Sequence, residues 1–214
     1  MTASIGNSGG SSPPQGGMLG SDYAALEAEI GTAVAELERQ EAAYRQSREK
    51  MEAVVAKCGK AMQLIHAGRA GDAERMLSEV RTELEGALED CAQAGANADV
   101  ALQEYVETSV LLAVMRGGPV PTREQLGVPS APYILGLADV LGELRREIIE
   151  KMRKDDYATA VRLFGLMEGL YELLLPVRIS NSIVPGLRRK LDVARSMVEQ
   201  CRRDILMYKI SKGL

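Results

Sequence analysis

The sequence predicts an all-α protein, a six- to seven-helix antiparallel bundle, and three observations support this. Aromatic residues make up only 4% of the 214 residues, with no tryptophan and one phenylalanine. A core must therefore be built from Leu, Ala, Val, Ile and Met, which favours helices over sheets. Apolar residues recur at helical spacing from about residue 22 to residue 210. No alternating pattern or hairpin turn signal indicates a strand.

Glycine and proline divide the helical pattern into separate segments. Gly68–Gly71 end the first segment, and Asp72 is the predicted N-cap of the second. Residues 117–132 contain four prolines and are predicted to form a loop. Asp155 and Asp156 are predicted to cap the fifth helix, and the last helix is predicted to close at Gly213. The predicted helices are 22–65, 72–94, 98–115, 132–153, 155–175 and 186–210.

Composition limits the class of protein. Residues 1–21 carry no charge and are rich in Gly, Ser and Pro, so we expect a disordered tail followed by a single helical domain over residues 22–214. No apolar window is long enough to span a membrane. Cys58, Cys91 and Cys201 indicate reduced thiols, and the expected location is the cytoplasm. The net charge of −4 argues against generic nucleic-acid binding, although a local basic face can still bind phosphates.

Two segments each place two carboxylates one helical turn apart. Glu104 and Glu107 have i,i+3 spacing, and Asp139 and Glu143 have i,i+4 spacing, so each pair shares one helix face. The first pair lies on a helix that becomes apolar on all sides over residues 109–115, so this helix must be covered on every side. Glu104 and Glu107 are therefore expected to face protein rather than open water. Periodicity places the second pair on a solvent-facing side with Arg146, Glu147 and Glu150. Taken alone, either pair has the ordinary explanation of a solvated helix face.

The residue types limit which metal these carboxylates would hold. His66 is the only histidine and no Glu-x-x-His unit surrounds it, which excludes the usual di-iron bundle. A site made of carboxylates alone suits a hard ion, Mg²⁺ or Mn²⁺. Such ions commonly act on phosphates, which points to phosphodiester or nucleotide chemistry.

The segments LQEYVE (102–107) and GLADVLGELR (136–145) resemble the two acidic motifs of Trax in the translin/Trax family. Residues 155–174 and 187–213 resemble the family's later helices, and residues 44–49 and 60–66 more loosely resemble its basic N-terminal helix. The likeness covers about residues 40–214 in the family's order. Translin lacks the carboxylate set, whereas this sequence keeps all four, so it resembles a Trax-like catalytic member of the prokaryotic or archaeal type.

The resemblance implies a seven-helix fold, a closed hollow homo-oligomer (octamer or hexamer) and Mg²⁺-dependent cleavage of single-stranded RNA inside it. Glu104, Glu107, Asp139 and Glu143 match the family's catalytic carboxylates, which would hold Mg²⁺ or Mn²⁺ while a metal-activated water attacks the phosphate. A general-base role for one of the four carboxylates is the alternative. Two other functions stay open: a translin-like protein that binds single-stranded RNA or DNA without cutting it, and a helical adaptor.

A basic stripe on the first helix is the candidate RNA-binding surface. Arg45, Arg48, Lys60 and His66 fall near one line of the helix, although Glu49 shares that face. The stripe is either a phosphate-binding surface or an ordinary mixed-charge face, and His66 could equally be a core histidine. Arg188, Arg189 and Lys190 form a second cluster, expected to pair with acidic neighbours or with a subunit interface. Tyr105 is expected in the core, with base stacking as the alternative.

Overall fold

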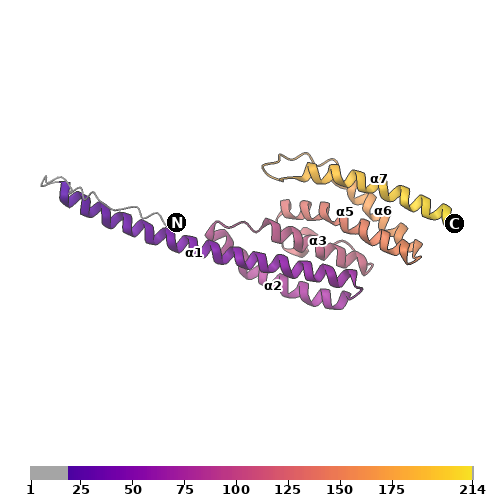
Figure 1. Ribbon diagram of the computed structural model, residues 1–214, viewed down its shortest axis with the longest axis horizontal. Coiled ribbons are helices and arrows are strands. Elements are labelled where there is room, and N and C mark those ends of the chain that lie inside the picture. Colours follow the sequence, from indigo (N-terminus) through magenta and orange to yellow (C-terminus); the bar gives the residue numbers. More distant parts are fainter. Residues whose placement is uncertain (1–18, 214) are drawn as a thin grey trace, which may run out of the picture. The chain divides into compact units, whose positions relative to one another are not determined.

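The structure, a computed structural model, describes the backbone of residues 19–213 and the side chains of residues 22–213. These residues form seven helices and no strand, which confirms the predicted all-α fold (Figure 1). The helices are α1 (Leu19–His66), α2 (Ala70–Ala94), α3 (Asp99–Met115), α4 (Arg123–Leu126), α5 (Ser130–Arg153), α6 (Tyr157–Leu174) and α7 (Leu187–Lys212).

The chain comprises two structural units, residues 1–43 and residues 44–214. In the first unit the described residues belong to α1, which begins three residues before the predicted start at Asp22. Residues 1–18 of the predicted disordered tail lie outside the described residues. The single domain over residues 22–214 stays a prediction, and the division after Ala43 falls inside the first helix.

Helix α5 is the central element of the second unit. It packs against α3 on one side and against α6 and α7 on the other, while α2 covers α3 (Figure 1). Three of its leucine and isoleucine side chains, at Leu141, Leu144 and Ile148, are wholly inaccessible to solvent. The apolar run of residues 109–115 on α3 is also covered within the chain, because Val110 and Leu111 are fully buried. Covering this run therefore does not require a second subunit.

Part of α1 and α2 share a strict 3.5-residue repeat of buried side chains, the spacing that keeps one seam of a helix against its partner. Ion pairs between Lys50 and Asp90 (2.7 Å) and between Lys57 and Glu83 link the two helices beside the core. The buried positions are Ser47, Met51, Val54, Cys58, Ala61 and Ile65 on α1, and Ala73, Leu77, Val80, Leu84, Ala87 and Cys91 on α2.

Two local predictions were wrong. Asp72 is not the N-cap of α2 but lies in its first turn, where Arg69 and Arg75 pair with its carboxylate. Residues 117–132 are not entirely loop, because they contain α4. There the Thr122 side chain accepts from the backbone of Gln125 and the Gln125 side chain accepts from the backbone of Thr122, a capping box that stabilises a single turn. The predicted cap at Asp156 and the close at Gly213 are confirmed.

The contact between α3 and α5 is closest at Gly136. A methyl group built on Gly136 would lie 2.7 Å from Val106 Cβ and 2.8 Å from the Gln103 carbonyl oxygen, well inside van der Waals contact. Val106 is itself fully buried. The two helices can therefore approach this closely only because residue 136 has no side chain.

We predict that Gly136→Ala destabilises the protein by about 1–3 kcal/mol, because the added methyl group forces α5 away from α3. Gly142→Ala on the same helix is the matched control, since nothing lies within 4 Å of its added carbon. The control should be neutral or stabilised by up to about 1 kcal/mol, because alanine favours helix over glycine. Urea unfolding measures both free energies, and equal midpoints for the two variants would contradict the prediction.

Candidate acidic site on α3 and α5

The four predicted carboxylates converge where α3 faces α5. Glu104 and Glu107 lie on α3, and Asp139 and Glu143 lie on α5. The negative charges of Asp139 and Glu143 raise the pKa of both Glu104 and Glu107, so all four groups act on one another electrostatically. The two helices thus bring together side chains that are 32 or more positions apart in the sequence.

Burial is the main cause of the altered acidity of the α3 pair. Desolvation is the largest contribution to the raised pKa of Glu104 and of Glu107, and like charges from the other carboxylates add to it. Together they raise the pKa of Glu107 to about 8. Glu107 is therefore largely protonated at neutral pH when no cation compensates its charge. The burial that the sequence predicts for Glu104 and Glu107 agrees with their half-buried side chains in the structure.

Asp139 and Glu143 are more enclosed than periodicity predicts. Their side chains are 30% and 25% exposed, and Glu147 on the same side of α5 is 4% exposed. The expectation of a solvated face was wrong for these positions because α5 is the central helix and is covered on most of its circumference. Arg146, by contrast, is exposed as expected.

A lysine from α7 reaches the acidic site. Lys190 Nζ forms an ion pair with Asp139 and donates to the Gln103 side-chain oxygen at 3.2 Å. Its positive charge lowers the pKa of Glu104 and Glu107, against the larger effect of burial. Of the two expectations for the 188–190 cluster, pairing with an acidic neighbour is the one that Lys190 fulfils within the chain.

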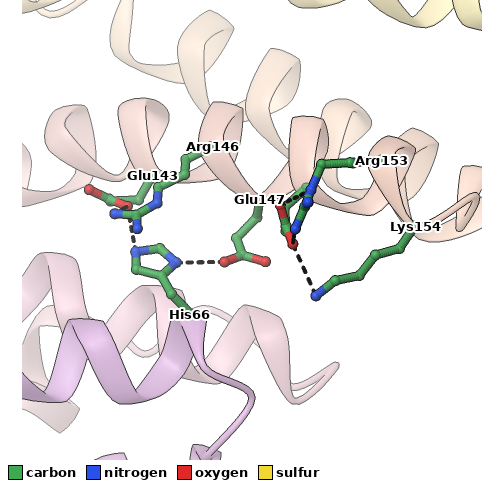
Figure 2. A network of polar contacts seen from close by, with 7 residues as sticks. His66, Glu143, Arg146, Glu147, Arg153 and Lys154 are labelled. Carbon is green, nitrogen blue, oxygen red and sulfur yellow. Dashed lines mark hydrogen bonds and ion pairs between the residues drawn. The ribbon is translucent and has the colours of Figure 1, made fainter.

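His66, the last residue of α1, lies between two glutamates of α5 (Figure 2). Its Nδ1 is 2.6 Å from Glu147 Oε1, and its Nε2 is 2.8 Å from Glu143 Oε2. The Nε2 contact has the distance of an ion pair but not the alignment of a hydrogen bond. Both ring nitrogens therefore lie against carboxylates of the bundle.

The other residues of the predicted RNA-binding stripe have mixed surroundings. Arg48 pairs with Glu52 on the next turn at 2.8 Å, and both side chains are largely exposed. Arg45 and Lys60 are also exposed. RNA binding by these residues and by His66 stays a prediction. To bind RNA, the His66 ring would have to leave at least one of its two carboxylate contacts.

The donor atoms of the acidic site fit a hard divalent ion. Cys58 lies near Glu104 and Glu107, but burial and their charges raise the pKa of its thiol to about 12. In the metal-free protein the thiol is therefore protonated, and the four carboxylates supply oxygen donors, which a hard ion prefers. As the side chains stand, no three Asp, Glu, His or Cys groups in the described part of the chain are placed to hold one ion. Binding would require side chains to turn, starting with the separation of Lys190 from Asp139.

Sequence reasoning missed two parts of this site. Lys190 is 51 positions from Asp139, and no spacing rule connects them. Glu147 continues the i,i+4 series of Asp139 and Glu143, and this regularity was the available signal. The apolar stripe of the helix instead predicted a solvated face for Glu147.

We predict that the metal-free protein loses stability as the pH rises from about 4.5 to about 8. The pKa of Glu107 is 4.5 in an unfolded chain and about 8 in the folded protein. Between these pH values the folded state therefore binds one proton more than the unfolded state. One such group changes the unfolding free energy by about 1.4 kcal/mol per pH unit. Glu107→Gln should reduce the slope of the unfolding free energy against pH, as measured by urea unfolding in the presence of chelator.

The matched control for this measurement is Glu150→Gln. Neighbouring Arg153 and Lys154 lower the pKa of Glu150 to about 2 in the folded state. It is therefore ionised in both the folded and the unfolded state above about pH 5.5. Its replacement should leave the slope between about pH 5.5 and 8 unchanged. A wild-type slope that Glu107→Gln does not alter would refute the assignment.

No helix in the described part of the chain is long and apolar enough to cross a membrane. The uncharacterized protein MJ0175 of Methanocaldococcus jannaschii is 40% identical over 107 residues, which are 50% of this chain and 48% of that protein. The chain thus spans about half the length of this curated relative.

Solved structures show the same fold. The AfC3PO–duplex RNA complex is 30% identical with a TM-score of 0.78, covering 86% of this chain and 97% of that chain. A crystal structure of AfC3PO is 30% identical with a TM-score of 0.77 (87% and 100% covered). Apo-NeC3PO, at 22% identity and a TM-score of 0.76 (84% and 96% covered), shows likeness of fold alone. A family model described as the translin family matches residues 21–211, and the chain therefore belongs to the translin family.

Proposed function

We propose that this protein is a Trax-like, Mg²⁺-dependent endoribonuclease that cleaves RNA, preferentially single-stranded, inside a hollow homo-oligomer. The observation that carries the proposal is the convergence of four carboxylates from α3 and α5. AfC3PO, which has the same fold, forms a complex with duplex RNA, and this supports RNA as the ligand. A non-catalytic RNA-binding protein would not need this costly concentration of buried negative charge.

In the proposed mechanism, Glu104, Glu107, Asp139 and Glu143 would hold the ion. When bound, a divalent ion supplies a water of lowered pKa and neutralises charge on the phosphate. Glu107 has to release its proton before its carboxylate can act as a ligand, so ion binding is linked to proton release. Lys190 has to leave Asp139, and its ammonium group then remains beside the site as a partner for a phosphate oxygen.

An exposed apolar stripe supports self-assembly. In the first unit, Leu26 and Ile30 are each 55% exposed and Leu37 is 62% exposed. With Ala33 they follow the 3.5-residue repeat of a helix that packs against another helix. We propose that a second copy of this chain covers them, which gives the homo-oligomer its contact.

We predict that Glu104→Gln with Asp139→Asn reduces RNA cleavage in Mg²⁺ by at least about 100-fold, because the ion loses charged ligands. Binding of the same RNA should persist. The measurement is cleavage of labelled single-stranded and duplex RNA with Mg²⁺, Mn²⁺ or chelator, alongside a binding titration.

Glu150→Gln is the control, because Glu150 pairs with Arg153 and Lys154 rather than with the acidic site. It should cleave like the wild type. Unchanged cleavage in the double variant would refute the proposed site. Wild-type protein that binds RNA but leaves it uncut in either metal would establish the binding function instead.

We predict that Leu26→Lys with Ile30→Lys lowers the oligomer mass measured by light scattering, because charged side chains do not tolerate burial between helices. Glu38→Lys, an exposed position of the same helix away from the apolar stripe and its flanks, changes the net charge by the same amount; it is the matched control and should keep the assembly. Equal masses for the apolar variant and the wild type would show that the stripe is not a subunit contact.

A further inference from the structure

Glu147 is the one fully buried charged residue in the described part of the chain. Burying a carboxylate is costly unless a cation or hydrogen-bond donor compensates it. Its compensating partner is His66, whose Nδ1 donates to Glu147 Oε1 over 2.6 Å. The proposed catalytic carboxylates do not include Glu147, so its burial needs a separate explanation.

The Glu147 contact fixes how the imidazole ring of His66 lies. The His66 side chain is only 10% exposed, and the Glu147 side chain 5%, so the ring has little freedom to rotate (Figure 2). With Nδ1 held by Glu147, Nε2 lies on the side of Glu143, 2.8 Å from its Oε2 atom. The ring thus connects a buried carboxylate with one member of the acidic site.

Among the described residues, the His66 ring makes the closest charged or polar contact of the Glu143 carboxylate. Its Oε2 atom is buried and makes no hydrogen bond within the described chain. Arg146 Nη1 is 3.9 Å away, but the Arg146 side chain is 62% exposed, so water screens this pair. The other carboxylates of the site repel Glu143. His66 is therefore the near, enclosed group that holds it in place.

We propose that His66, held by Glu147, is a positioning residue that fixes the Glu143 carboxylate for binding a divalent cation. This inference rests on the proposed function of the acidic site. It follows the general behaviour of metal sites, in which a partner behind the ligand fixes its orientation and changes metal affinity about 10- to 100-fold. It also assigns His66 a role within the bundle, whereas the sequence alone left it as a residue of an RNA-binding stripe or a core histidine.

The test measures Mn²⁺ binding to the full-length protein by electron paramagnetic resonance of the free ion. His66→Ala should weaken Mn²⁺ binding about tenfold, and Glu147→Leu should weaken it similarly, because the ring loses its anchor. His66→Gln should recover most of the affinity, since its side-chain amide is polar and can donate to Glu143. Glu150→Gln, one turn further along α5, is the control and should bind as the wild type does.

Folding is checked separately, because His66 also joins α1 to α5. Circular dichroism and thermal unfolding establish that each variant is folded at the temperature of the titration. A merely structural role would lower the unfolding temperature of His66→Ala without changing the affinity of the folded protein for Mn²⁺. Wild-type affinity in folded His66→Ala would therefore overturn the inference.

A thermal double-mutant cycle in chelator separates this inference from the proposed function. If His66 holds Glu143, the loss of unfolding temperature in His66→Ala should shrink when Glu143→Gln is already present. Additive effects would overturn the inference. Wild-type protein that binds no Mn²⁺ and yet shows this coupling would refute the metal-dependent function while confirming the contact.

Discussion

The close approach of α5 to α3 at Gly136 determines where the acidic site forms. Because Gly136 faces α3, residues three, seven and eleven positions later lie close to the same side of the helix. These residues are Asp139, Glu143 and Glu147. One glycine therefore sets both the distance between the helices and the direction in which a row of carboxylates points. A side chain at position 136 would change the site without touching any of its charges.

The row of carboxylates meets polar partners from helices at the two ends of the chain. Lys190 of α7 pairs with Asp139, and the His66 ring at the end of α1 contacts Glu143 and Glu147. Among the described residues Glu107 has no such partner, and its raised pKa shows the remaining cost of desolvation and repulsion. The site is therefore short of positive charge on the α3 side. A divalent ion would relieve this shortage, which is a physical reason for the proposed metal binding that does not depend on resemblance.

Sequence periodicity predicts this fold well where a helix has one buried side and poorly where it has several. The α2 helix buries one stripe, and its extent was predicted to within two residues at its start. The α5 helix is covered on most of its circumference, so its apolar stripe wrongly placed Asp139, Glu143 and Glu147 in solvent. The pairing of Lys190 with Asp139 depends on tertiary contacts that no local pattern encodes. The four carboxylates were predicted, but their partners largely were not.

The helix α1 carries the 3.5-residue repeat through both structural units, with different outcomes. Small residues such as Ser47, Cys58 and Ala61 occupy the repeat where it is buried against α2, whereas Leu26, Ile30 and Leu37 occupy it where it is exposed. Burying a leucine or isoleucine stabilises by about 1.5–3 kcal/mol. The larger apolar surface that packing against another helix could still bury therefore lies in residues 22–43. These residues include none of the acidic-site residues. The proposed subunit contact and the proposed acidic site therefore involve separate residues of the chain, and we expect that each can be removed without the other.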